Sequence, residues 1–314
     1  MIQEHIPVLL KESIELLNIN ENGIYVDCTL GRAGHSKEIL KKLKKGHLYA
    51  IDQDNEAIQS SKEALKQVSN NFTILEGNFA YMKTLLALQN VDKVDGILYD
   101  LGVSSPQFDN DSRGFSYRFD SELDMRMDVL NNSLTAKKVV NEYDQKQLSE
   151  IFKYLGEEQF AFGISQKIVD YRKTKEIKTT GELVEIIKSA LPQKILKKKK
   201  HPAKKVFQAL RIHVNNELEN LKKSLIQALE IINKNGVIVV ITFHSLEEKI
   251  IKSIFKEKTI DNDDKFLSKL PVQNLISKKE FELLIKKPIT ASEEELSVNR
   301  RAHSAKLWAI KKVG

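Results

Sequence analysis

Short apolar segments alternate with segments of helical periodicity over the first hundred residues, and this alternation is the strongest constraint on the fold. The strand candidates are residues 24–28, 48–52, 72–75 and 97–100, and the helix candidates that separate them are 36–45, 56–68 and 81–89. A strand that is buried on both faces has a continuous apolar run, and parallel strands need a crossover helix between them. The sequence therefore predicts βαβ units and a doubly wound α/β fold with a parallel sheet.

The alternation stops in the middle of the chain and resumes later. Residues 109–205 show helical periodicity and no convincing strand. A long amphipathic helix then follows, with apolar positions at spacings of three and four: Leu210, Val214, Leu218, Leu221, Leu225 and Leu229. Strand candidates at 237–241 and 305–310 flank a helix candidate at 246–256. We predict one α/β domain made of residues 1–108 and 206–314, with a helical insertion domain, residues 109–205, between its fourth and fifth strands.

Composition narrows the class of protein. An apolar content of 41% and a charged content of 30% are typical of a soluble globular chain. Because no apolar run approaches the roughly 18 residues that span a bilayer, and the N-terminus lacks the layout of a signal peptide, we expect a cytoplasmic protein with no membrane partner. The single cysteine, Cys28, excludes an internal disulfide and a cysteine zinc cluster. The histidines lack metal-ligand spacing, so no metal is expected, and His35 and His244 are expected to form hydrogen bonds as neutral rings.

Positive charge is concentrated in the predicted insertion. The chain carries a net charge of +7, and residues 129–211 hold 18 Lys and Arg against 9 Asp and Glu. Such a region favours a polyanionic partner, although Lys-rich helices also occur simply as solvated surfaces. The basic run that begins at Lys197 predicts contacts with RNA phosphates. The candidate RNA-binding residues are Lys199, Lys200, His201, Lys204 and Arg211, together with Arg113 near the start of the insertion.

The turn after the first predicted strand, Gly31-Arg32-Ala33-Gly34-His35, is a candidate ligand site. Small residues at 31, 33 and 34 let a ligand approach the backbone where the chain enters a helix. The turn lacks the G-x-G-x-x-G spacing that binds a pyrophosphate, so a dinucleotide is not the favoured ligand. An ordinary tight turn remains the alternative.

Carboxylates end two of the predicted parallel strands. Asp52 ends the second strand, where a carboxylate accepts both hydroxyls of a ribose, and Phe79 follows the third strand, where we expect it to lie along an adenine ring. Asp100 ends the fourth strand and opens a loop of small hydroxylated residues that includes Ser104 and Ser105. Two acids beside a glycine-containing turn suit a cationic nucleoside, and S-adenosylmethionine fits this description. The alternative is that each acid caps a helix.

Several unusual segments occur in an order that resembles one known family. They are His5-Ile6-Pro7-Val8-Leu9-Leu10, Gly31-Arg32-Ala33-Gly34-His35-Ser36, Ala50-Ile51-Asp52-Gln53-Asp54, Asp100-Leu101-Gly102-Val103-Ser104-Ser105-Pro106-Gln107, Arg113-Gly114-Phe115-Ser116, Leu123-Asp124-Met125-Arg126-Met127-Asp128, Lys200-His201-Pro202-Ala203, Val214-Asn215-Asn216-Glu217-Leu218 and Phe243-His244-Ser245-Leu246-Glu247-Glu248. The chain resembles the MraW (also called RsmH) family of S-adenosylmethionine-dependent methyltransferases. These enzymes act on N4 of a cytidine in small-subunit (16S) ribosomal RNA, in the ribosomal decoding region.

The resemblance implies a Rossmann-like (class I) methyltransferase sheet and assigns roles to residues of this chain. The family's cofactor contacts fall on Ala33, Gly34, His35, Asp52, Phe79, Asp100 and Gln107. The implied substrate is small-subunit ribosomal RNA within a 30S particle or a late assembly intermediate, and a homodimer is left open. The chain departs from the family pattern at Ala33, where the family has glycine, and at His303 and Trp308, where it has arginine.

The implied reaction sets a chemical requirement for the loop after the fourth strand. A cytosine N4 is a poor nucleophile because its lone pair is delocalised into the ring, so acceptors for its hydrogens should stabilise the transition state. We assign this catalytic role to Asp100, Ser104 and Ser105, and the sequence leaves open whether Asp100 takes the proton or only orients the amine. Two other classes explain part of the sequence. A nicotinamide-dependent oxidoreductase shares the sheet but predicts G-x-G-x-x-G, and a non-catalytic RNA-binding module explains the basic insertion but not the strand-end acids.

Overall fold

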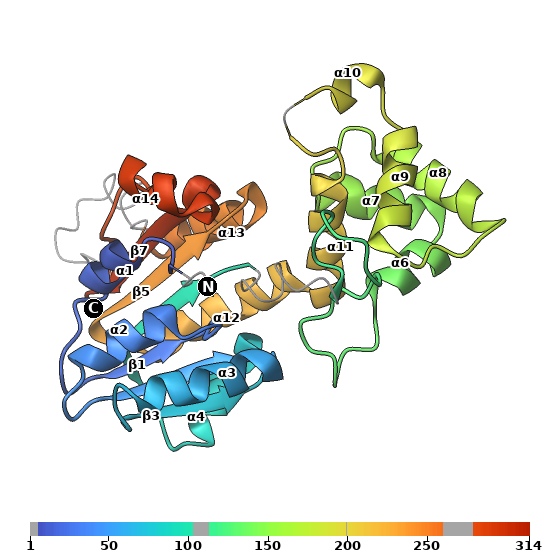
Figure 1. Ribbon diagram of the computed structural model, residues 1–314. Coiled ribbons are helices and arrows are strands. Elements are labelled where there is room, and N and C mark those ends of the chain that lie inside the picture. The colour runs from blue at the N-terminus through green and yellow to red at the C-terminus, as the bar shows by residue number, and fades with distance from the viewer. Residues whose placement is uncertain (1–5, 103–112, 199, 260–278) are drawn as a thin grey trace, which may run out of the picture. The chain divides into compact units, whose positions relative to one another are not determined.

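A computed structural model describes residues 6–102, 113–198, 200–259 and 279–314 (Figure 1). The chain divides into two compact units. We call the first the sheet unit, which comprises Met1–Gly102 and Leu218–Gly314, and the second the helical unit, which comprises Val103–Glu217. The predicted Gln107, Ser104, Ser105 and Lys199 lie outside the described residues.

A seven-stranded sheet forms the centre of the sheet unit, in the order β3-β2-β1-β4-β5-β7-β6. Its strands are β1 (Ile24–Asp27), β2 (His47–Asp52), β3 (Phe72–Glu76), β4 (Val94–Asp100), β5 (Ile232–Thr242), β6 (Phe281–Leu283) and β7 (Lys306–Lys312). The first five pair in parallel, and β7 pairs antiparallel with both β5 and β6. The doubly wound α/β class expected from the sequence is confirmed. The strand order reverses beside β1 and β4, which is where ligands bind in such sheets.

Helices cover both faces of this sheet, because alternate residues of the central strands point to opposite sides. Tyr99 and Val240 pack with α4 (Met82–Ala87), α12 (Glu217–Ile231) and α13 (Ser245–Thr259). Their neighbours Leu98 and Val239 pack with the helices of the opposite face, α1 (Leu10–Leu17), α2 (Gly34–Lys42) and α3 (Asn55–Lys66). The remaining helical elements of this unit are η1 (Phe79–Tyr81), α14 (Glu293–Val298) and η4 (Arg300–Ser304). The two-sided burial explains why the strands read as continuous apolar runs in the sequence.

The helical unit has its own hydrophobic core. Its helices are α6 (Ala136–Glu142), α7 (Gln145–Tyr154), α8 (Ala161–Arg172), α9 (Thr180–Ser189), α10 (Gln193–Leu196) and α11 (Lys204–Asn215). Capping boxes begin α7 and α9, with Asp144 and Thr179 as the N-cap residues. These local signals fix where the two helices start, and their apolar faces then meet in a core that includes Leu148, Phe152 and Leu183.

The single long helix predicted across Leu210 to Leu229 is wrong. The chain instead forms α11 and α12, which are separated by Asn216 in the left-handed conformation with φ 50°. Asparagine tolerates this conformation better than most residues. The break divides the apolar stripe between two cores. Leu210 and Val214 lie in the core of the helical unit, whereas Leu221, Leu225 and Leu229 lie in the core of the sheet unit. The helical unit therefore runs to Glu217, whereas the sequence placed the end of the insertion at 205.

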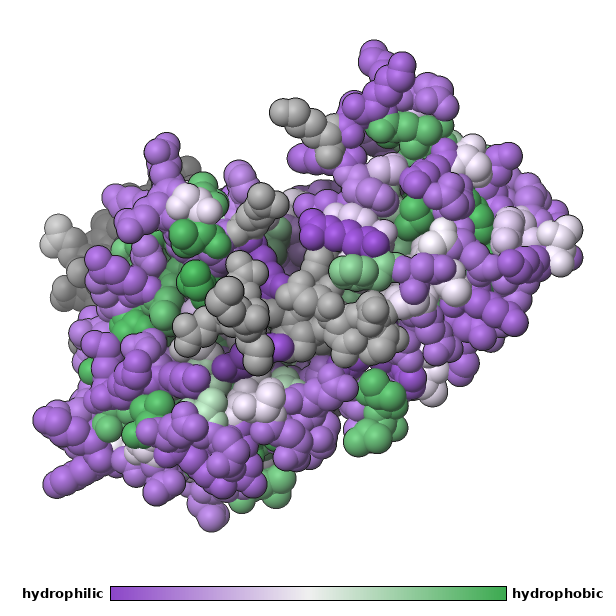
Figure 2. Space-filling model, viewed as in Figure 1, coloured by the Kyte–Doolittle hydropathy of each residue, from purple (hydrophilic) through white to green (hydrophobic). Residues whose placement is uncertain are grey.

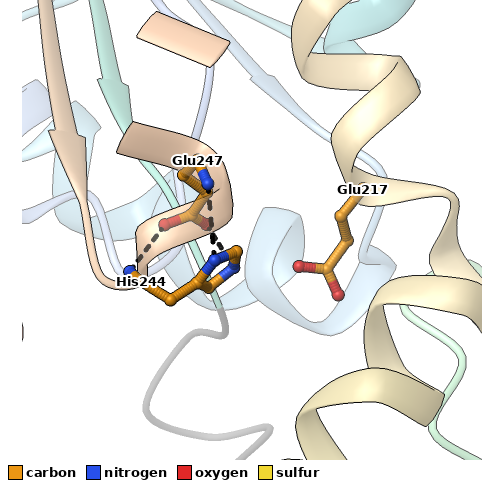
Figure 3. A group of neighbouring side chains, drawn as sticks. All are labelled: Glu217, His244 and Glu247. Carbon is orange, nitrogen blue, oxygen red and sulfur yellow. Dashed lines mark hydrogen bonds and ion pairs between the residues drawn. The ribbon is translucent and has the colours of Figure 1, made fainter. Parts of the chain in front are cut away.

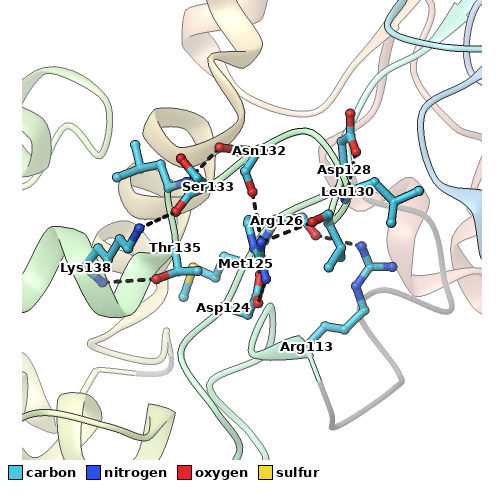
Figure 4. A network of polar contacts seen from close by, with 12 residues as sticks. Arg113, Asp124, Met125, Arg126, Asp128, Leu130, Asn132, Ser133, Thr135 and Lys138 are labelled. Atoms are coloured by element: carbon cyan, nitrogen blue, oxygen red, sulfur yellow. Dashed lines mark hydrogen bonds and ion pairs between the residues drawn. The ribbon is translucent and has the colours of Figure 1, made fainter.

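Residues 123–134 of the helical unit are held by polar contacts rather than by regular secondary structure (Figure 4). Arg126 forms a bidentate ion pair with Asp124, at 2.8 and 2.6 Å, and its Nη1 donates to the carbonyl of Asn132 at 2.8 Å. Asn215 anchors the segment from α11. Its Oδ1 accepts the N–H of Met127 at 2.8 Å, and its Nδ2 donates to the carbonyls of Met125 at 2.8 Å and Arg211 at 2.9 Å.

We expect Asn215→Ala to destabilise the helical unit by about 3 kcal/mol. The substitution removes the side-chain hydrogen bonds to the N–H of Met127 and the carbonyl of Met125, and each such loss costs about 1–3 kcal/mol, partly offset by relaxation. Urea unfolding followed by circular dichroism measures the change. Asn131→Ala is the matched control, because Asn131 is exposed and bonds to the adjacent Asp128; it should change stability by less than about 0.5 kcal/mol. Equal effects of the two substitutions would contradict the anchoring role.

Candidate functional site

The turn between β1 and α2 is built around a buried carboxylate, Asp27, which is 1% exposed. Ser36 Oγ donates to its Oδ2 at 2.6 Å, and the N–H of Thr29 donates to its Oδ1 at 3.0 Å. Burial raises the pKa of Asp27, and these hydrogen bonds oppose the shift. Asp27 is not among the site residues predicted from the sequence. The signal was available, because Asp27 ends β1 as Asp52 ends β2 and Asp100 ends β4.

The turn itself needs a left-handed backbone at two positions. Gly31 has φ 48° and Ala33 has φ 59°. A residue with a Cβ pays about 1–2 kcal/mol for this conformation, so Ala33 is strained where the family pattern has glycine. Ala33 is fully buried at the N-cap of α2, and its methyl group is a small addition at this point. The departure from the family pattern therefore affects backbone strain more than the space in the turn.

The N-terminal segment covers this turn. A Cβ on Gly34 would collide with the ring of Pro7, so the glycine allows the segment to approach. His35 is 5% exposed, and its Nε2 donates to the carbonyl of Val8 at 3.1 Å. Burial lowers the pKa of His35 to about 4, which agrees with the expected neutral ring. Residues near the C-terminus hold the segment from the other side. Glu295 Oε1 accepts the N–H of Leu9 at 2.9 Å, and Asn299 Nδ2 donates to the carbonyl of Ile6 at 3.0 Å.

Asp52 faces the same turn from the end of β2. Its Oδ2 accepts the N–H of Gly31 at 2.8 Å, and its Oδ1 accepts the N–H of Asp54 at 2.9 Å. Burial raises its pKa to about 6, against the opposing effect of these two hydrogen bonds. The N-cap of α3 is Asp54, whose side chain accepts from Glu56. Asp52 therefore does not cap the helix itself, and each of its oxygens keeps a lone pair that can accept a ribose hydroxyl.

The carboxyl of Asp100 receives fewer hydrogen bonds from the described residues than those of Asp27 and Asp52. Its backbone N–H donates to Thr29 Oγ1 at 2.7 Å, and its Oδ2 lies 3.6 Å from His35 Nδ1, which is beyond hydrogen-bond distance. The side chain is 23% exposed overall, but Oδ1 is buried and has no hydrogen-bond partner among the residues that the structure describes. Burial raises the pKa of Asp100 to about 8, with further contributions from the charges of Asp27 and Glu247.

Two further contacts lie near the ends of neighbouring strands, one between aromatic rings and one between His244 and Glu247. Phe79 packs edge-on against Tyr99 of β4, with ring centroids 5.8 Å apart. His244 follows β5, and Figure 3 shows it beside Glu247 in the first turn of α13. Glu247 is 3% exposed, and its Oε2 accepts the N–H groups of Phe243 at 2.7 Å and His244 at 3.1 Å. His244 was expected near the site from the sequence, but Glu247 was not among the predicted residues. Its position three residues after the N-cap is a known helix-start signal that would have indicated it.

The structure thus brings the described candidate residues of the sheet unit to the carboxyl-terminal edge of one parallel sheet. These residues are Ala33, Gly34, His35, Asp52, Phe79 and Asp100. Such an edge offers backbone amides, buried acids and an aromatic face to one ligand. Cys28 is buried behind it, with Sγ 3.5 Å from Met82 Sδ, and belongs to the core.

The candidate RNA-binding residues of the helical unit have different surroundings. Figure 2 shows mostly hydrophilic residues on the visible face of this unit, and Lys200 and Lys204 are exposed. His201 stacks on Tyr117, with centroids 4.3 Å apart and an interplanar angle of 12°.

The two arginines of this set bind within the unit. Arg211 forms a bidentate ion pair with Glu217 at 2.9 Å, in which the side chains are 16% and 14% exposed. Arg113 Nη2 donates to the carbonyls of Arg126 at 2.6 Å and Met127 at 3.0 Å. Both guanidinium groups therefore support the fold of the helical unit.

A family model and relatives of similar sequence indicate one family. A sequence model described as the MraW methylase family matches residues 2–313. Proteins named ribosomal RNA small subunit methyltransferase H are similar to this chain. The one from Mesoplasma florum is 60% identical over 99% of this chain and 100% of its own length, and that from Mycoplasma mycoides subsp. mycoides is 62% identical over the same shares. A crystal structure described as a putative rRNA-methylase from Clostridium thermocellum aligns with a TM-score of 0.44 and 11% identity, over 98% of this chain and 100% of that one. Among the described residues, no helix combines the length and apolar character that crossing a membrane requires.

We expect Asp100→Asn to make the ligand-free protein more stable than wild type at about pH 8, with the difference shrinking toward about pH 4. The pKa of about 8 in the folded chain lies above the ordinary value of 3.8. Between these values the folded state binds the proton more tightly than the unfolded state, so the stability of wild type falls as the pH rises. An amide does not titrate and escapes this loss, which amounts to about 1.4 kcal/mol for each unit of pKa shift.

Thermal unfolding across this pH range measures the effect. The matched control is Asp92→Asn, because Asp92 is an exposed acid that precedes β4. A difference between Asp100→Asn and wild type that stays constant with pH would contradict the burial of this carboxyl.

Proposed function

Because this chain belongs to the MraW methylase family, we propose that it transfers a methyl group from S-adenosylmethionine to the exocyclic N4 of a cytidine in the decoding region of small-subunit ribosomal RNA. The observation that carries the proposal is the state of Asp100. At the edge where the strand order reverses, β4 ends in a carboxyl whose buried Oδ1 has no hydrogen-bond partner within the described part of the chain. A methyltransferase needs an acceptor at this point, where a cationic methyl donor meets an amine.

The residues of this edge fit S-adenosylmethionine. Asp52 keeps lone pairs for the ribose hydroxyls, and Phe79 offers an aromatic face at the end of β3 for the adenine. The turn through Ala33 and Gly34 would lie along the cofactor, and Gln107 would add a contact from the loop. A positive sulfonium group favours the ionised form of a nearby carboxyl, so binding of the cofactor should lower the pKa of Asp100 and supply the charge that this buried side chain lacks.

Methyl transfer to N4 requires the protein to orient the amino group and to accept a hydrogen bond from it. The bound cofactor would supply an electrophilic methyl group, whose bond to sulfur would break as its bond to N4 forms, with the neutral thioether as the leaving group. Asp100 Oδ1 accepts a hydrogen bond from the N4 amino group, which aligns the nitrogen lone pair with the methyl group. Because positive charge builds on N4 in the transition state, this acceptor stabilises the transition state more than the ground state. Ionised Asp100 then takes the N4 proton, and Ser104 and Ser105 position the base.

The helical unit would bind the RNA. Lys200 and Lys204 are exposed cations on either side of the turn that begins α11, and His201 presents a ring stacked on Tyr117. Contacts from such side chains to phosphates give affinity that does not depend on sequence. Lys199 would add to this basic run. Arg113 and Arg211 would contribute mainly by holding the unit together, since both are engaged within it. The substrate would be the RNA within a 30S particle or a late assembly intermediate.

The two other classes considered from the sequence are less well supported. The family match is to a methylase family, and the turn after β1 lacks the dinucleotide fingerprint that an oxidoreductase would need. A non-catalytic RNA-binding module would not explain why three acids are buried at one sheet edge, since each costs free energy to desolvate.

Methyl transfer to small ribosomal subunits from cells that lack the protein tests the proposal. We expect tritium from labelled S-adenosylmethionine in one cytidine, and mass spectrometry of the nucleosides should identify N4-methylcytidine. Asp100→Ala should lower the rate at least about 100-fold, as the loss of a transition-state acceptor does elsewhere. Asp92→Ala, at an exposed acid of the same unit, should leave the rate unchanged. Methylation at another atom, or Asp100→Ala within a few-fold of wild type, would contradict the proposal.

Replacing Lys200 and Lys204 with alanine should weaken RNA binding and flatten its salt dependence. Each phosphate contact that is lost should reduce the slope of log K against log salt by about 1. Filter binding at several salt concentrations measures the slope. The control carries alanine at Lys146 and Lys167, two exposed lysines of α7 and α8. The same slope in both double variants would place the RNA on another surface.

A further inference from the structure

We propose that Asp100 and His244 form a donor–acceptor pair that reads the Watson–Crick edge of the target base and selects cytosine against uracil. The inference rests on the proposed function and deepens it, because it names the residues that determine the base. Both side chains belong to the sheet unit, and they follow the neighbouring strands β4 and β5.

The hydrogen bonds around His244 fix which ring nitrogen carries the proton. The N–H of Glu247 donates to His244 Nδ1 at 3.4 Å, so Nδ1 is the acceptor and the neutral ring carries its hydrogen on Nε2. Glu247 Oε1 lies 3.1 Å from Nε2 without forming a hydrogen bond to it, and its negative charge favours a hydrogen on this nitrogen (Figure 3). Because Glu247 also accepts two backbone N–H groups at the start of α13, the ring is held in place by the cap of a 15-residue helix.

Within the ranges that the structure describes, two buried polar atoms at this edge lack a hydrogen bond. The side chain of His244 is 9% exposed, and its Nε2 has no hydrogen-bond partner among the described residues, despite the short contact with Glu247. Asp100 Oδ1 is in the same situation. A buried donor or acceptor without a partner is destabilising. The pairing of one unused donor with one unused acceptor therefore points to a ligand that supplies the complementary groups.

The sheet register places the two residues at adjoining strand ends. Asp100 is opposite Ile241, and the N–H of Leu101 donates to the carbonyl of Ile241 at 3.1 Å. One residue further, a Cβ on Gly102 would lie 3.6 Å from Cδ2 of Phe243. His244 follows directly. The charge of Glu247 also contributes to the raised pKa of Asp100, as expected for groups of one site.

The pair matches cytosine and opposes uracil. Cytosine presents the N4 amino group as a donor next to N3 as an acceptor, so Asp100 Oδ1 can accept from N4 while His244 Nε2–H donates to N3. Uracil presents the reverse order, with O4 as an acceptor and N3–H as a donor. Uracil would place acceptor against acceptor and donor against donor, and a site with unpaired buried polar groups rejects such a ligand. The same contact to N4 orients the nitrogen for methyl transfer.

Single-turnover methylation with a modified substrate tests the pair. Small subunits are reconstituted with either cytidine or 3-deazacytidine at the methylated nucleotide, because 3-deazacytidine keeps N4 but replaces the N3 acceptor with C–H. We expect wild type to react about 10- to 100-fold more slowly with 3-deazacytidine, the range of a specific base contact. His244→Asn should be slow with cytidine and show no further loss with 3-deazacytidine. Additive losses in this variant would overturn the pair.

His244→Gln provides the matched comparison. An asparagine amide replaces Nδ1 as the helix-capping acceptor but does not reach the position of Nε2, whereas a glutamine amide can place an N–H there. His244→Gln should therefore keep most of the sensitivity to 3-deazacytidine that His244→Asn loses. Calorimetry with S-adenosylmethionine checks that both variants still bind the cofactor. A wild-type enzyme that transfers no methyl group to cytidine would refute the proposed function itself, whereas equal wild-type rates on the two substrates would refute only the pair.

Discussion

Three carboxylates that are buried or partly buried at one edge of a parallel sheet are the constraint on which this site depends. Asp27, Asp52 and Asp100 end β1, β2 and β4, and burial raises the pKa of each. A buried acid is tolerated when donors surround it. The turn after β1 supplies donors to the first two, through Ser36 and the backbone N–H of Gly31. Asp100 Oδ1 has no donor among the described residues. A cationic ligand at this strand end would therefore stabilise its negative charge.

Distant parts of the chain complete this edge. Pro7 packs against Gly34, and the segment that carries it is fastened by Glu295, which lies 286 residues further along the chain than its partner Leu9. On the other side, the N–H of Glu247 donates to Nδ1 of His244 at the start of α13. These contacts restrict the turn and the strand ends to one arrangement. The described residues of this edge are therefore preorganised by the fold before any ligand binds.

Much of the sheet unit could be predicted because its signals are local. Strands buried on both faces are continuous apolar runs, and the acids that end β1, β2 and β4 are visible in the sequence. The helix across Leu210 to Leu229 could not be predicted correctly for the opposite reason. Its spacing of apolar residues is unbroken, but the left-handed backbone at Asn216 and the allocation of its two halves to separate cores depend on contacts elsewhere. The spacing of Glu247 from the start of its helix is visible in the sequence, but that spacing does not show that the carboxylate is buried beside His244.

The sequence by itself determined the kind of fold, the interruption of the sheet by a helical segment and the positions of the acids and the glycine turn. These features follow from periodicity and from residues close in the chain. Only the tertiary structure decided which acids receive hydrogen bonds and that Arg211 is paired with Glu217. It also decided that Asp100 and His244 follow adjacent strands. Compensation of buried charge depends on groups that are far apart in sequence, and no local pattern records their distance in the folded chain.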